Sequence, residues 1–301
     1  MMSPYEIKKE ICEIGRRIYM NGFVAANDGN ISVKVSENEY YCTPTGVSKG
    51  FMTPDMIIKI DADGNKLEGK LNPSSEIKMH MRVYRERPDV NAVVHAHPPT
   101  ATAYAVAGIP LDKYLLPEAI LVLGDVPICK YGTPSTMEIP DSLEPYIQTH
   151  DAFLLQNHGA LTVGCNLTKA FFVMEEVEFS AKIALMAQQL GNQNELTCDE
   201  LAKLMELRVK MQIPGKHPGC KKCPNLGTEN CKCKQNLPHG TSASCSCGSA
   251  APADVSDDLV AEITRKVLAE LKTYDRIFRV GDLFYPPRVS GFASRAGVKK
   301  S

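Results

Sequence analysis

The stretch VVHAHPP, Val93 to Pro99, places two histidines on alternate residues of a segment whose valines favour an extended chain. Successive side chains of a strand point to opposite faces, so His95 and His97 are predicted to project from the same face. Neutral imidazole is a common metal ligand. The pair therefore predicts one side of a metal site.

Two other residues are candidates to complete this site. His158 ends a later apolar strand, and Gly159 after it allows the backbone to turn tightly. Glu76 lies in a predicted helix just before the strand with the paired histidines, where it is either a fourth ligand or a base. Catalytic zinc uses three protein ligands and leaves one position for water or substrate. His80 and His150 have no partner at ligand spacing, so we interpret them as ordinary core or surface residues.

Helical and extended patterns alternate along the chain on both sides of these residues. Predicted helices cover 3–22, 73–87, 101–107, 168–191 and 196–211, and predicted strands lie in 30–59, 91–95, 124–129 and 152–156. We expect Ser3, a serine of the Ser74–Ser75 pair and Thr168 to cap three of the helices. The 301 residues, 44% of them hydrophobic, suffice for one substantial core with a small appendage.

Charge and composition limit the classes of partner. A net charge of −1 gives no field that would attract nucleic acid or an anionic membrane, so a small-molecule substrate is favoured. The chain has no apolar run of membrane-spanning length and no signal-peptide layout at its start. We therefore expect a cytoplasmic protein whose eleven cysteines are mostly free thiols.

The composition changes after about residue 213. Residues 214–253 hold five prolines, five glycines and six cysteines with few aliphatic residues, which predicts a flexible linker. Residues 254–272 return to helical periodicity with a narrow apolar stripe, and 273–301 form a basic tail. The pairs of cysteines between Cys220 and Cys247 leave a second metal site open, although a thiol-rich linker is the favoured interpretation.

Three motifs together resemble the class II aldolase/adducin family over about residues 3–212. They are Ser74-Ser75-Glu76, His95-x-His97-Pro98 and Asn157-His158-Gly159, in this order and separation. The resemblance implies an α/β fold for residues 1–213, a three-layer α/β/α single domain with a mainly antiparallel central sheet. It also implies that His95, His97 and His158 bind one Zn²⁺ per subunit of a homotetramer, and that Glu76 both touches the metal and acts as base.

The resemblance further implies a site for a substrate phosphate and a proton donor. The phosphate-binding residues correspond to Gly29-Asn30, Thr45-Gly46 and Ser74-Ser75. The serines suit an anion because a helix N-terminus offers free N–H groups and the positive end of the dipole. Tyr114, in the loosely matching segment DKYLLPEA, corresponds to the proton donor, with a half-buried packing role as the alternative.

The implied reaction is metal-dependent cleavage of a fuculose-type ketose 1-phosphate to dihydroxyacetone phosphate and lactaldehyde. Proton transfer by Glu76, displaced from the metal when substrate binds, is expected to need a carboxyl pKa that burial raises and the metal restrains. Pentulose-phosphate 4-epimerases, rhamnulose or ribulose phosphate aldolases and a thiosugar-phosphate dehydratase use the same kind of site. A scaffold or binding module that acts through its C-terminal helix is the alternative without chemistry.

The segment 254–272 resembles the encapsulation peptides that direct enzymes into bacterial microcompartments. A narrow apolar stripe has too little surface to fold alone, but it can dock on a shell protein or on a helix of another cargo protein. This predicts localisation in a microcompartment, where a reactive aldehyde product is confined. The alternative is that the helix packs on its own domain.

Overall fold

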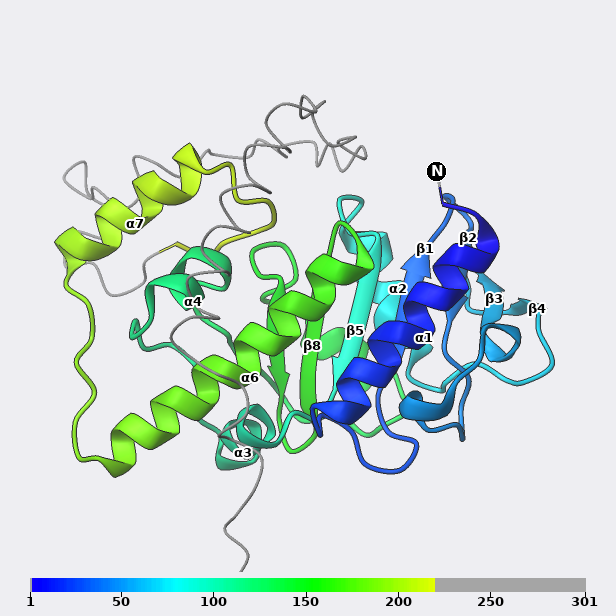
Figure 1. Cartoon of the computed structure of the whole chain (residues 1–301), viewed down its shortest axis with the longest axis horizontal. Coiled ribbons are helices and arrows are strands. Elements are labelled where there is room, and N and C mark those ends of the chain that lie inside the picture. The colour runs from blue at the N-terminus through cyan, green and yellow to red at the C-terminus, as the bar shows by residue number, and fades with distance from the viewer. Residues whose placement is uncertain (1, 220–301) are drawn as a thin grey trace, which may run out of the picture. The chain divides into compact units, whose positions relative to one another are not determined.

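The computed structural model describes residues 2–219, and it consists of helices around one sheet (Figure 1). The helices are α1 (Pro4–Met20), α2 (Ile77–Glu86), α3 (Pro99–Ala107), α4 (Pro117–Val122), α5 (Glu138–Ser142), α6 (Leu167–Gln189) and α7 (Cys198–Lys210), with the short 3-10 helices η1 (Lys49–Phe51) and η2 (Pro54–Met56). The helix predicted at 254–272, the tail at 273–301 and most of the linker predicted at 214–253 lie outside the described residues. The described start of that linker packs on the domain, since the backbone N–H of Lys216 donates to Asp151 Oδ2 at 2.9 Å.

Eight strands form one sheet that is antiparallel at all but one of its pairings. The strands are β1 (Asn30–Lys34), β2 (Glu39–Cys42), β3 (Ile58–Asp61), β4 (Lys66–Glu68), β5 (Ala92–Ala96), β6 (Ile128–Cys129), β7 (Ala152–Leu155) and β8 (Gly159–Gly164). Their order is β4-β3-β2-β1-β5-β8-β7-β6, and only β6 and β7 run parallel. The prediction of a mainly antiparallel sheet is confirmed.

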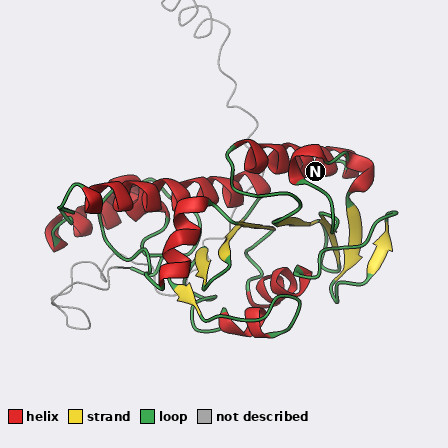
Figure 2. Cartoon of the chain, turned by 90° about the horizontal axis from the view of Figure 1, so that it is seen from below, coloured by secondary structure: helices red, strands yellow, loops and turns green. Residues whose placement is uncertain are grey.

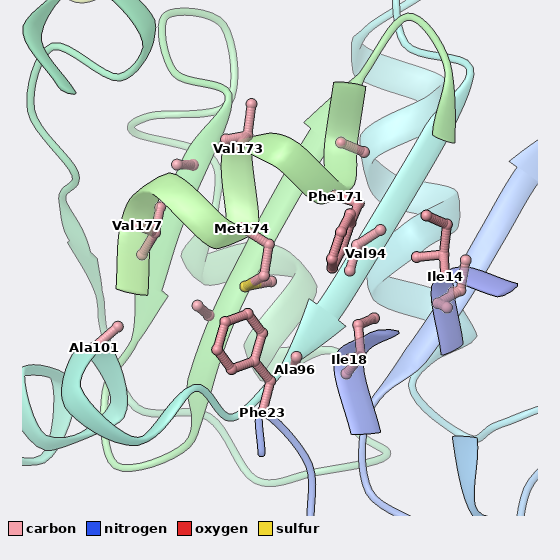
Figure 3. Packing of buried hydrophobic residues seen from close by; sticks show 14 of the residues in the cluster. Ile14, Ile18, Phe23, Val94, Ala96, Ala101, Phe171, Val173, Met174 and Val177 are labelled. Carbon is pink, nitrogen blue, oxygen red and sulfur yellow. The ribbon is translucent and has the colours of Figure 1, made fainter. Parts of the chain in front are cut away.

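Helices cover both faces of this sheet, which makes three layers (Figure 2). Residues of α1, α3 and α6 form one buried apolar cluster with one side of the strands, and residues of α2 and α5 form another with the opposite side. Strand β5 contributes to both clusters, because Val94 packs in the first and Val93 in the second. Figure 3 shows Val94 close to Phe171 of α6 and Ile14 of α1.

The first helix forms where its sequence predicts it. Ser3 and Glu6 make a capping box, in which the serine hydroxyl accepts from the Glu6 N–H and the glutamate accepts from the Ser3 N–H. Ile11, Ile14 and Ile18 are buried at helical spacing. This amphipathic pattern holds α1 against the sheet.

The caps predicted for the two other helices differ from those of the structure. The long helix α6 is capped by Asn166, whose side chain accepts from the Lys169 N–H, whereas the Thr168 hydroxyl donates to Glu10. Helix α2 begins at Ile77 with Glu76 at the N-cap position. Its two serines precede it because Pro73 pairs with Pro44 in an isolated β-bridge and keeps the chain extended there.

Strand β8 was not predicted. All six of its residues are buried, so the sequence GALTVG lacks the alternation of apolar and polar residues that identifies a half-buried strand. It forms a hairpin with β7 and also pairs with β5, which places the β7–β8 turn beside the end of β5. No helix within residues 2–219 combines the length and the apolar character needed to cross a bilayer.

Candidate metal centre

The paired histidines lie at the end of β5, in the middle of the sheet. His95 is fully buried and points to the face covered by α2, as Val93 two residues earlier does. His97 follows the last strand residue and is a quarter exposed. The Nε2 atoms of the two imidazoles are 3.1 Å apart, so both rings are directed to one point.

The third histidine reaches the same point from the β7–β8 hairpin. Asn157 adopts a left-handed conformation with φ of 56°, and this turn places His158 opposite the β5 histidines. The His158 ring centroid is 4.7 Å from that of His95 and 5.1 Å from that of His97.

The three side chains fit a metal ion. One ring nitrogen from each residue lies within 4.8 Å of the others. The ligand atoms of a tetrahedral zinc ion, with zinc–nitrogen bonds of about 2.0–2.1 Å, are separated by about 3.3 Å. Only a small closure of the rings is therefore needed for His95, His97 and His158 to share one zinc ion.

Neighbouring acceptors orient two of the rings. The Ala160 carbonyl lies 2.9 Å from His95 Nδ1 and accepts its proton, which leaves the lone pair of Nε2 facing the centre. Asp28 Oδ2 lies 3.6 Å from His97 Nδ1 and favours the same tautomer there. Burial lowers the pKa of His95 to about 3, so its imidazole is neutral at pH 7, the form that binds metal.

Glu76 places a carboxylate beside these nitrogens. Its Oε1 is 3.1 Å from His158 Nε2, and its Oε2 is 3.5 Å from His95 Nε2. Asn30 Nδ2 donates to Oε2 at 2.6 Å. Burial raises the pKa of this carboxyl, but the interactions with the two histidines and Asn30 outweigh burial and hold it below its ordinary value. In this arrangement Glu76 is therefore an ionised carboxylate, and the raised pKa expected once substrate displaces it from the metal stays a prediction.

Three hydrogen bonds join β1 to α2 and fix the position of Glu76 along the helix axis. Asn30 binds Glu76, and two residues later the hydroxyl of Ser32 contacts His80 Nδ1 at 2.7 Å and the Tyr84 hydroxyl at 2.8 Å. The contacts keep in step along both elements, because two residues of a strand span a similar length to four residues of a helix. We name these five residues the β1–α2 ladder. His80 is thus a buried residue of the core, and burial lowers its pKa to about 4.

Gly159 is required by close contact rather than by an unusual backbone angle. A Cβ at this position would lie 2.5 Å from His97 Cδ2 and 2.6 Å from the Ala96 carbonyl oxygen. The left-handed residue of the turn is Asn157 instead. The sequence predicts that Gly159 allows a tight turn. In the structure, its lack of a side chain instead leaves room for the His97 ring.

Substitution Gly159→Ala is expected to displace His97, to weaken zinc binding about tenfold to a hundredfold and to reduce stability by about 1–3 kcal/mol. A competition titration with a chromophoric chelator and urea unfolding measure the two effects. Gly22→Ala is the matched control, because Gly22 has φ of +70° and no atom within 4 Å of an added Cβ. The control should lose stability with unchanged zinc affinity, and equal zinc affinity in Gly159→Ala would contradict the prediction.

The residues predicted to bind phosphate lie beside the histidines on two loops and the start of α2. Asn30 Nδ2 is 3.4 Å from Ser74 Oγ. The Thr45 N–H donates to the Asn72 carbonyl, which brings the loop of Thr45 and Gly46 to the segment before α2. Ser75 is exposed and accepts from Ser135 Oγ at 2.8 Å. Exposed hydroxyls and backbone at this edge can receive an anion next to the metal ligands.

Gly29 lies in the first of these loops with φ of +74° and with His95 close to it. An added Cβ would lie 2.9 Å from the His95 carbonyl oxygen. Glycine at this position therefore lets the loop of Asn30 approach the end of β5.

Tyr114 is placed with different neighbours. It is 2% exposed and packs in a small cluster with Ile120 of α4 and Leu201 of α7, and its hydroxyl donates to the Gly219 carbonyl at 3.5 Å. The structure groups it with α4 and α7, rather than with the three histidines. His150, interpreted as a core or surface residue, is buried with Nε2 at 3.5 Å from Asp125 Oδ2.

Sequence reasoning overlooked two charged residues near the site. Asp28 lies against His97, and the only sequence signal for it is its place in the turn NDGN, a string common in ordinary turns. Lys49 is a buried cation that bonds to the loops of the residues predicted to bind phosphate. A lysine in a stretch of small and apolar residues gives no signal of that role.

Comparison with known proteins agrees with this geometry. The family described as Class II Aldolase and Adducin N-terminal domain matches residues 9–185. An L-fuculose phosphate aldolase of Methanococcus maripaludis is 33% identical over 181 residues, which cover 60% of this chain and 97% of the relative. A 3-oxo-tetronate 4-phosphate decarboxylase of Escherichia coli O6:H1 is 31% identical over 204 residues, which cover 66% of this chain and 94% of the relative.

Solved structures give the same result. An L-fuculose 1-phosphate aldolase superposes with a TM-score of 0.64 and 31% sequence identity, covering 69% of this chain and 97% of that protein.

Proposed function

The chain belongs to the class II aldolase and adducin family, and from this premise we propose that it is a zinc-dependent aldolase that cleaves a fuculose-type ketose 1-phosphate. The products are dihydroxyacetone phosphate and lactaldehyde. The observation that carries the proposal is the convergence of three imidazoles on one point with the Glu76 carboxylate beside them. A scaffold protein without chemistry has no need for this arrangement of buried groups.

The proposed metal is one zinc ion per subunit, held by His95, His97 and His158. Three neutral imidazoles are a common donor set for catalytic zinc. When bound, the ion supplies Lewis-acid stabilisation of the negative charge that develops on the substrate oxygens as the carbon–carbon bond breaks. Glu76 can serve as a fourth ligand before substrate enters, because both of its oxygens lie close to histidine Nε2 atoms.

Glu76 is the proposed acid and base. In cleavage, the ionised Glu76 carboxylate would accept the proton that the hydroxyl next to the breaking bond loses as the aldehyde forms, and would then return this proton to the carbon atom released from that bond. The Glu76 carboxyl is the titratable group positioned to deliver a proton to this carbon, and Asn30 and the β1–α2 ladder hold it in place. Tyr114 stays the proposed donor to the aldehyde oxygen in the reverse reaction, a role in which its buried hydroxyl would have to leave the Gly219 carbonyl and the cluster of α4 and α7.

The substrate phosphate is proposed to bind on Gly29-Asn30, Thr45-Gly46 and Ser74-Ser75. Support comes from Asn30, which contacts both Ser74 of this set and the Glu76 carboxylate beside the three histidines. The contact between Asn30 and Glu76 couples the phosphate end of the substrate to the reacting end. A ketose with phosphate on its first carbon spans these two places.

A substrate screen with the purified zinc-loaded protein tests the proposal. The panel contains fuculose, rhamnulose and ribulose 1-phosphates, a pentulose 5-phosphate and 3-oxo-tetronate 4-phosphate, the last because of the decarboxylase relative. We expect the largest kcat/KM for a ketose 1-phosphate, read as dihydroxyacetone phosphate in a coupled assay. Carbon dioxide release from the 3-oxo acid, or epimerisation of the pentulose phosphate, as the main activity would contradict it.

A homotetramer is proposed, and helix α6 supports assembly. Its buried side faces the sheet, yet Phe172, Phe179 and Met186 are each at least half exposed at intervals of seven residues. Residues seven apart lie on the same side of a helix. Such a row of large apolar side chains on the surface is typical of a protein interface.

Substitution of both Phe172 and Phe179 by glutamate is expected to shift the assembly to a smaller species, because two charges would have to be buried in the contact. Sedimentation velocity gives the molar mass. Leu67→Glu, at a half-exposed leucine on β4, is the control and should leave the mass unchanged. A tetramer that persists in the double variant would show that this side of α6 does not lie in the interface.

Targeting to a microcompartment shell is proposed for residues 254–272, which lie outside the described residues. The support is their sequence, with apolar side chains at helical spacing after a stretch poor in aliphatic residues. A fluorescent protein fused to 254–272 is expected to co-localise with shells, and the same fusion with Ile263→Asp and Val267→Asp is expected to be diffuse. Diffuse signal from the unaltered fusion would refute targeting by this segment.

A further inference from the structure

Lys49 is a buried cation next to the proposed phosphate site. It is 2% exposed, and its Nζ donates to the Asn27 carbonyl at 2.9 Å and the Val47 carbonyl at 2.7 Å. None of the ion pairs found among residues 2–219 involves this lysine. A buried ammonium without a counter-ion is costly, and burial lowers the pKa of Lys49 to about 8 against the opposing effect of Asp28 and Glu76.

The buried arginines among residues 2–219 show two kinds of partner, and one of them, Arg208, is held by the carbonyls of Leu121 and Gly215 much as Lys49 is held by its two carbonyls. Arg87 is also almost fully buried, but it is paired with both Asp89 and Asp151. The charge of Arg87 is thus compensated within the chain, whereas Lys49 is held by carbonyl groups alone. An anion from outside the chain would supply the missing partner for Lys49.

The two carbonyls belong to the two loops that carry proposed phosphate-binding residues. Asn27 precedes Gly29-Asn30, and Val47 follows directly after Gly46. The ammonium therefore lies where these loops meet. The other groups proposed for the site are neutral, namely an amide, hydroxyls and the backbone of glycines, so they can orient a phosphate but do not neutralise its two charges.

We propose that Lys49 determines the specificity of the site for phosphorylated substrates, because its ammonium supplies the positive charge for the phosphate dianion. This inference rests on the proposed function, because it concerns the same phosphate site. It adds which residue supplies the positive charge there. Attraction between charges is strong at a buried position, where the effective dielectric constant is far below that of water. Hydrogen bonds through the loops keep the charge fixed, and no flexible side chain has to be ordered when the substrate binds.

The test separates the charge of Lys49 from its hydrogen bonds. Lys49→Gln keeps a donor for a carbonyl but removes the charge, and Lys49→Arg keeps both. Binding of inorganic phosphate to the metal-free full-length protein is measured by calorimetry at pH 7. We expect the dissociation constant to rise about tenfold to a hundredfold in Lys49→Gln and to stay within about threefold in Lys49→Arg.

Lys66→Met is the matched control, because Lys66 is an exposed lysine whose Nζ donates to the Leu71 carbonyl and to Asn72 Oδ1 beside the same site. Its phosphate binding should equal that of the wild type. Steady-state kinetics add a second readout: Lys49→Gln should reduce kcat/KM, through KM, at least about tenfold more for the phosphorylated ketose than for the unphosphorylated ketose.

The outcomes distinguish this inference from the proposed function. Phosphate binding that is equal in wild type and Lys49→Gln would overturn the role of Lys49 alone. Equal losses on phosphorylated and unphosphorylated ketoses would also overturn it, since they indicate a purely structural role. If the wild-type protein binds no phosphate, both the phosphate site of the proposed function and this inference fail.

Discussion

Substitution His95→Ala is expected to abolish zinc binding and to reduce aldol cleavage by at least about a thousandfold. His95 is the most buried of the three histidines, and its Nε2 is close to both His97 Nε2 and the Glu76 carboxylate. Its loss leaves two imidazoles, which form an incomplete set for catalytic zinc. Lewis-acid stabilisation contributes several kcal/mol to such reactions, and about 4 kcal/mol corresponds to that factor.

Zinc content by mass spectrometry and dihydroxyacetone phosphate release measure the two effects together. His150→Gln is the control, because His150 is also a buried histidine but lies beside Asp125 rather than in the triad. It should retain one zinc ion per subunit. The wild type should lose activity with a chelator and regain it with added zinc, and a fully active metal-free protein would refute the metal centre.

Substitution Glu76→Gln is expected to lower kcat by about 10²–10⁴-fold while zinc stays bound. Glutamine has the size of glutamate and can still accept the hydrogen bond from Asn30, but it cannot carry the proton. The three imidazoles are unchanged. The predicted effect therefore falls on the chemical step rather than on metal binding.

Exchange of hydrogen between dihydroxyacetone phosphate and deuterated water gives a readout independent of cleavage. Wild-type protein should catalyse this exchange at the carbon that forms the new bond, and Glu76→Gln should not. Glu86→Gln, at the other end of α2 where Glu86 pairs with Arg82 on the surface, should behave as the wild type does. Persistent exchange in Glu76→Gln would assign the proton transfer to another group.

The fold and the centre of the site can be predicted in part from local sequence patterns, and the structure contains the elements that these patterns predict. The alternation of VVHAH predicts which face carries the histidines, because β5 is extended and its side chains alternate. The capping box of Ser3 and the isoleucines of α1 predict that helix within two residues of its bounds. Both features depend on residues close together in the sequence.

The missed features depend on distant contacts. Strand β8 is buried on both faces, so it has no periodicity to detect. The start of α2 is delayed by the bridge between Pro44 and Pro73, and the environment of Lys49 depends on two loops 20 residues apart in the sequence, at Asn27 and Val47. Tyr114 shows the same limit, because its packing on α7 involves residues far along the chain.

The hairpin of β7 and β8 has a consequence for how this protein can change during evolution. His158 lies in the connection that sets which residues of β8 pair with β5, where Leu161 lies opposite His95. Gain or loss of one residue there would turn every side chain of β8 to the other face of the sheet. Lineages descended from this protein should therefore conserve the length of that connection strictly.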